Sequence, residues 1–112
     1  MQAMTEQTDQ VIIFCTCPSD NAVAKNLAEQ LVSQRLAACV NIMPNVQSVY
    51  TWQGKIAHDH ENLLIIKSRR SLYSEIEAKI KALHPYELPE IIMVTLDAGL
   101  PDYLNWINQS TS

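Results

Sequence analysis

The chain has 112 residues, enough for one domain that buries a little under about two-thirds of its unfolded surface. Its formal net charge is −4, and its longest run of cations is the pair Arg69 and Arg70, which argues against a nucleic-acid partner. Its two glycines, Gly54 and Gly99, are too far apart for either glycine-rich phosphate-binding loop, so we expect no nucleotide. No apolar run is long enough to cross a bilayer, and three cysteines in a chain with a polar N-terminus predict a reduced, cytoplasmic protein.

The first part of the chain predicts a strand and then a helix. Residues 1–10 have no periodicity and are expected to form a disordered tail, followed by a single domain over residues 11–112. Residues 11–15 are a continuous β-branched and aromatic run, typical of a strand buried on both faces. Asp20, or the serine before it, can cap a helix that extends to about Leu36.

Residues 39–68 predict two long strands that meet at a turn around Gly54. The arms have roughly 12 to 15 residues each, whereas strands of globular proteins usually have about 5 or 6. One small core cannot cover arms of this length. Tyr50 and Trp52 share one face of the first arm by the period of two, so we expect both aromatic side chains to anchor an interface with another copy of this chain.

The remainder predicts a second helix, a fourth strand and a closing helix. Ser71 can cap the second helix, which should end before Pro85. A strand follows over residues 90–96, and Pro101 suits the first turn of a terminal helix. The order strand, helix, strand, strand, helix, strand predicts an α+β ferredoxin-like sandwich with an antiparallel sheet of order 4-1-3-2.

This topology brings chemically useful side chains to one edge of the sheet. The end of the first strand carries Cys15 and Cys17, the loop after the second helix carries His84, and the hairpin tip carries Trp52. Thiolates are soft ligands suited to Cu(I) or Zn(II), and an imidazole can join them. Two other interpretations stay open: Cys15 as an ordinary buried strand cysteine, and His84 as a residue that caps the end of its helix.

Other residues offer weaker candidates. His58 and His60 share one face of the second hairpin arm and could bind a metal, although exposed histidines are more often solvated. Met43 is interpreted as core packing. Cys15 and His84 could form a thiolate–imidazolium pair, but no third catalytic residue or oxyanion donor accompanies them, so we expect no enzymatic activity.

Several segments resemble the CutA divalent-cation-tolerance family. They are FCTCPS, RLAACVNI, the W-x-G-K-I turn at residues 52–56, HPYELPE at residues 84–90 and YLNWI at residues 103–107. The resemblance covers nearly all of residues 11–107. It implies a cytoplasmic ferredoxin-like homotrimer whose long hairpins wrap neighbouring subunits, with a fold relationship to the PII signalling trimers. It also implies a role in tolerance of copper and other divalent cations.

The resemblance also suggests ligands. The family cysteine attributed to copper matches Cys15, and the histidine before Pro-Tyr matches His84. Some bacterial relatives have two adjacent histidines there, whereas this chain has Leu83 at the first position; Cys17 is a possible additional ligand where many relatives have a small residue. We therefore expect a non-enzymatic trimer that binds copper or another divalent cation, with unknown protein partners. The alternative is a PII-like signalling or protein-interaction trimer in which metal binding is incidental.

Overall fold

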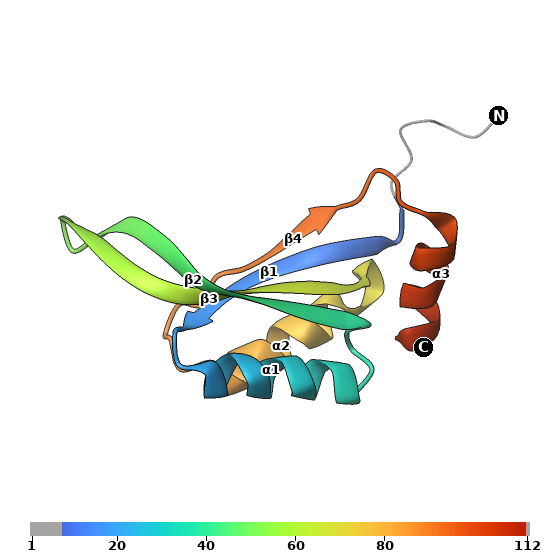
Figure 1. The fold of residues 1–112 in the computed structure, drawn as a ribbon, viewed down its shortest axis with the longest axis horizontal. Coiled ribbons are helices and arrows are strands. Elements are labelled where there is room, and N and C mark those ends of the chain that lie inside the picture. Colours follow the sequence, from blue (N-terminus) through green and yellow to red (C-terminus); the bar gives the residue numbers. More distant parts are fainter. Residues whose placement is uncertain (1–7, 112) are drawn as a thin grey trace.

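The computed structural model describes residues 8–111, which form an α+β fold (Figure 1). The elements are β1 (Gln10–Pro18), α1 (Asn21–Ser33), β2 (Cys39–Trp52), β3 (Lys55–Arg69), a 3-10 turn (Arg70–Leu72), α2 (Tyr73–Leu83), β4 (Ile91–Thr95) and α3 (Pro101–Ser110). The described strands make one antiparallel sheet of order β2-β3-β1-β4. Counted from the other edge, this is the predicted order 4-1-3-2, so the ferredoxin-like arrangement is confirmed.

One face of the sheet carries the core. Helices α1 and α2 lie side by side against it (Figure 1). Most of the buried apolar side chains of this core come from β1, α1, β3 and α2: Val11, Ile13, Cys15, Cys17, Ala24, Leu27, Leu31, Leu64, Ile66, Ile76 and Ile80. The expectation that β1 is buried on both faces is wrong, because Ile12, Phe14 and Thr16 are only partly buried on the open face.

The long hairpin is present with the expected length, 14 residues in β2 and 15 in β3. Gln53 and Gly54 form its two-residue turn with φ angles of 52° and 78°, the backbone that matches the twist of two antiparallel strands. A β-bulge between Met43 and Val46 was not predicted; Asn45 has a φ of 62° there. The hairpin extends away from the rest of the molecule (Figure 1).

Several apolar side chains lack cover from their own chain. Met43 on the open face of the sheet is 50% exposed, so its interpretation as core packing is wrong. Ile92 and Val94 of β4 are also exposed on this face, and Trp52 at the hairpin tip is 56% exposed. Exposed apolar area of this extent is typical of a surface that another molecule covers.

Element ends differ from the predictions. Strand β1 begins at Gln10 and continues to Pro18. Of the expected tail, residues 8–10 are described, and the backbone N–H of Thr8 donates to the carbonyl of Leu96 at 3.1 Å; residues 1–7 lie outside the described residues. Asp20 caps α1 by accepting from the backbone N–H of Ala22 at 2.9 Å.

None of the helices among residues 8–111 is both long enough and apolar enough to span a membrane.

Candidate metal centre

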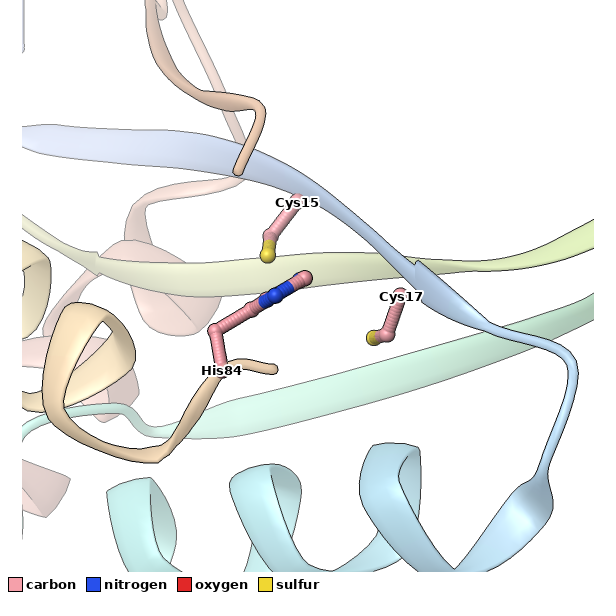
Figure 2. Close-up of side chains that lie close together, drawn as sticks. All are labelled: Cys15, Cys17 and His84. Atoms are coloured by element: carbon pink, nitrogen blue, oxygen red, sulfur yellow. The ribbon is translucent and has the colours of Figure 1, made fainter. Parts of the chain in front are cut away.

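The end of β1 and the end of α2 bring three donor side chains together. Cys15, Cys17 and His84 offer ligand atoms that all lie within 4.8 Å of one another, and Figure 2 shows both thiols pointing toward the ring. Both cysteines are fully buried and His84 is 8% exposed. The predicted convergence of these three residues is therefore present. Whether they bind a metal is a separate question.

The two thiols share one side because β1 stays extended through both of them. Cys15 pairs with Leu64 and Cys17 with Asn62 on the neighbouring strand β3. The amide of Asn62 is itself buried, and its Nδ2 donates to the carbonyl of Pro18 and to Oδ1 of Asn21, both at 3.3 Å. These bonds fix the connection from β1 to α1, so the strand cannot turn away before Cys17.

The imidazole of His84 has a hydrogen-bond partner on each ring nitrogen. Nδ1 accepts from the backbone N–H of Tyr86 at 3.1 Å, which requires the ring proton to be on Nε2. Nε2 then donates to the carbonyl of Thr16 at 2.7 Å. Thr16 is the first residue of β1 beyond the ladder with β4, which ends at the pair of Cys15 and Ile91. The ring therefore joins the end of α2 to β1.

His84 is also the C-terminal cap of α2, where its backbone N–H donates to the carbonyl of Ile80 at 2.8 Å. The ring points elsewhere, to Thr16 and Tyr86. A metal would have to take one ring nitrogen from its present partner, which costs about 1 to 3 kcal/mol when the partner stays buried and unpaired. Retaining the bond to Thr16 would leave Nδ1 for the metal, with a backbone carbonyl orienting the ring.

The two thiols interact strongly with each other. A side-chain hydrogen bond with Cys17 raises the pKa of Cys15, and burial and the charges of Glu90 and Glu61 raise it further. The same hydrogen bond lowers the pKa of Cys17, against the effect of burial. The contact between the two thiols therefore raises the pKa of one and lowers the pKa of the other. Such a pair suits a soft cation that replaces the shared proton, and it does not suit a Cys15 nucleophile.

Tyr86 and Glu61 were missed by sequence reasoning. The phenol of Tyr86 donates to Oε2 of Glu61 at 3.2 Å, and its ring lies 4.7 Å from that of His84. Burial, followed by the charge of Glu61, raises the pKa of Tyr86 to about 12. Glu61 belongs to β3 opposite Pro18, where the hairpin leaves the sheet. No spacing in the sequence indicates that Tyr86 and Glu61 lie close together.

The other candidates lie apart from this cluster. Trp52 extends from the same end of the sheet, but its partner Lys55 lies seven residue steps along β3 from Asn62, a distance of about 23 Å. The expectation that the hairpin tip lies at the thiol edge is therefore wrong. His58 and His60 are exposed, and no group of three or more donors within residues 8–111 includes them.

The donor set fits a soft metal in kind, with two sulfur atoms and one nitrogen. In a tetrahedral site with metal–sulfur bonds of about 2.3 Å, the two sulfur atoms lie about 3.8 Å apart. The sulfur atoms of Cys15 and Cys17 are at most 4.8 Å apart, so they would have to move closer together by about 1 Å or less to reach that geometry. Fold and site together define a small ferredoxin-like protein with a buried cluster of soft donors at one edge of its sheet.

Comparisons with known proteins agree with this class. The model of the CutA1 divalent ion tolerance protein family matches residues 11–110. The divalent-cation tolerance protein CutA of Thermus thermophilus is 41% identical over 89% of this chain and 96% of that protein. The crystal structure of CutA from Xylella fastidiosa superposes with a TM-score of 0.90 at 44% identity, covering 94% of this chain and all of that one. The chain belongs to the CutA1 divalent ion tolerance family.

A plant relative is longer. Protein CutA 1, chloroplastic, of rice is 40% identical over 99% of this chain, and the chain spans 62% of the length of that protein. The match to the bacterial relatives extends over nearly their whole length. Family membership therefore applies to the domain that the described residues form.

Proposed function

We propose that the chain is a divalent-cation tolerance protein, a cytoplasmic homotrimer that binds copper or another divalent metal ion and takes part in the response to metal ions. The observation that carries the proposal is the convergence of Cys15, Cys17 and His84 within 4.8 Å in a buried site. The family and the Thermus relative are both named for tolerance of divalent ions. Free, unpaired thiols suit the reducing cytoplasm.

The test is a copper titration under reducing conditions. We expect one equivalent per chain in the wild type and loss of binding in Cys15→Ser. Cys39→Ser is the matched control, since Cys39 is a free, partly buried thiol at the start of β2 and lies outside the cluster. Equal stoichiometry in the wild type and Cys15→Ser would remove the ligand assignment.

The trimer is supported by the apolar area that one chain leaves exposed. Tyr50 and Trp52 lie on one face of the projecting hairpin, and Met43, Ile92 and Val94 lie on the open face of the sheet. A second and third copy can cover these side chains, as a closed ring of identical subunits requires. Tyr50 and Trp52 are the proposed anchors of that interface.

A non-enzymatic role is supported by the state of the thiols. Catalytic cysteines are partly exposed and have lowered pKa values. Cys15 is fully buried and its pKa is raised. Cys17 has a lowered pKa but is equally buried, and its hydrogen bond comes from another thiol instead of a base.

One observation favours the alternative, a PII-like signalling or protein-interaction trimer in which metal binding is incidental. Both ring nitrogens of His84 already have protein partners, so the ring has a structural role without any metal. The same titration separates the two functions. A trimer that takes up no copper would support the interaction role.

A further inference from the structure

We infer that Cys15 and Cys17 are a redox pair: hydrogen peroxide oxidises them to a disulfide within β1, and this disulfide releases His84 and opens the loop that follows α2. The disulfide forms in the metal-free protein, so it does not depend on the proposed function. The two thiols become a site of reversible modification. Residues 84–90 become the segment that responds to it.

The two sulfur atoms are close enough to join. They are at most 4.8 Å apart, and a disulfide needs about 2.05 Å, so they have to approach by at most about 2.8 Å. The third thiol cannot compete, because it pairs with Lys67, whereas Cys15 pairs with Leu64. These partners are three residues apart along β3, so Cys39 lies on the other face of the sheet.

The oxidation uses one molecule of hydrogen peroxide for each pair of thiols. One sulfur takes an oxygen atom from the peroxide and becomes a sulfenic acid, and the remaining oxygen leaves as water. The second sulfur then displaces hydroxide from the sulfenic acid to form the S–S bond. Its thiol proton leaves with that hydroxide as a second water. Two electrons pass from the thiols to the peroxide, and exchange with an added dithiol reverses the step.

The loop at residues 84–90 gives a small oxidant access to the two buried thiols. The loop contains no helix or strand, and every residue in it except His84 is exposed or only partly buried, with Leu88 82% exposed. Segments with few buried contacts open locally more often than the core. The ring of His84 lies beside both thiols (Figure 2), so an opening of this loop exposes them.

The carbonyl of Thr16 connects the redox pair to the loop. Nε2 of His84 donates to it at 2.7 Å, and Sγ of Cys15 lies 3.7 Å from the same oxygen. Alternate Cα atoms of an extended strand are about 6.7 Å apart, whereas disulfides usually join Cα atoms about 5.5 to 6 Å apart. The disulfide therefore shortens β1 by about 1 Å at Thr16, where the ladder with β4 has already ended. This movement takes the carbonyl away from the ring, and the bond that attaches the loop to β1 is lost.

The first experiment treats the full chain with hydrogen peroxide in the presence of a metal chelator. Alkylation after denaturation and mass spectrometry then count the thiols. We expect one alkylatable thiol instead of three, and a loss of two hydrogen atoms in the tryptic peptide that ends at Lys25 and contains both cysteines of the pair. Cys39→Ser should lose the same two hydrogen atoms, whereas Cys15→Ser and Cys17→Ser should form no intrachain disulfide.

Three remaining thiols in the treated wild type, or a sulfur that gains oxygen without forming an S–S bond, would overturn the inference. Copper is absent throughout, so either result leaves the proposed function intact.

Hydrogen exchange measures the release of the loop. In the reduced chain the backbone N–H of Tyr86 donates to Nδ1 of His84 at 3.1 Å, and the ring is held on β1. After oxidation we expect the amides of residues 84–90 to exchange about two- to tenfold faster, the change that loss of one hydrogen bond produces. Cys15→Ser should exchange equally before and after treatment with peroxide. Equal exchange in the oxidised and reduced wild type would show that the disulfide does not control the loop, and the inferred switch would be wrong.

Discussion

Replacement of Trp52 by alanine tests the proposed role of the hairpin tip. In the single chain this side chain is 56% exposed. A tryptophan can bury up to about 250 Å², so about 140 Å² remains for a neighbouring subunit to cover. At about 25 cal/mol per Å², covering that area contributes at most about 3.5 kcal/mol per chain to assembly. Loss of even about 1 kcal/mol per chain raises the concentration for half-dissociation of a trimer roughly tenfold.

Sedimentation velocity over a dilution series measures this change, and thermal unfolding gives an independent value. Trp52→Ala should dissociate at higher concentration and unfold at lower temperature than the wild type. Gln47→Ala is the control, because Gln47 is an exposed residue on the other face of the same strand. If Trp52→Ala shows the wild-type species and the wild-type heat resistance, the hairpin tip does not anchor an interface.

Two further predictions concern a helix cap and a phenol. Asp20→Ala removes the acceptor for the N–H of Ala22, so the free energy of unfolding should fall by about 1 kcal/mol in denaturant titration; an unchanged value would mean that the cap contributes nothing. The pKa of Tyr86 is raised to about 12, so its contribution to stability is complete below pH ~10, its unfolded value, and is lost as the pH rises through 12. Glu61→Gln should lower the pKa of Tyr86, which phenolate absorbance measures; an unaltered titration would exclude the effect of the carboxylate.

Much of the fold could be predicted because its signals are local. Gly54 is the only glycine between two long strand patterns, and it is in the turn with a φ of 78°. The ends of elements were harder to predict where the backbone adopts an unusual conformation without glycine. Helix α1 ends at Ser33 and not near Leu36, because Arg35 has a φ of 61° and the chain turns there.

The candidate metal site was partly predictable, because part of its sequence signal is also local. The spacing of Cys15 and Cys17 puts both thiols on one side of a strand, and the topology brings His84 to them. The bonds of His84 to Thr16 and Tyr86 could not be predicted, because both partners are backbone groups, which nearly every residue type offers. Their effect is large: they decide whether the ring is free to bind a metal.

The most direct test is native mass spectrometry of the full chain after copper loading under reducing conditions and removal of unbound metal. It reports the number of chains and the number of metal ions in one measurement. The account predicts a mass of three chains with three copper ions, and three chains without copper for Cys15→Ser. A copper-free assembly, a single chain, or a Cys15→Ser trimer that retains its full copper content would contradict it.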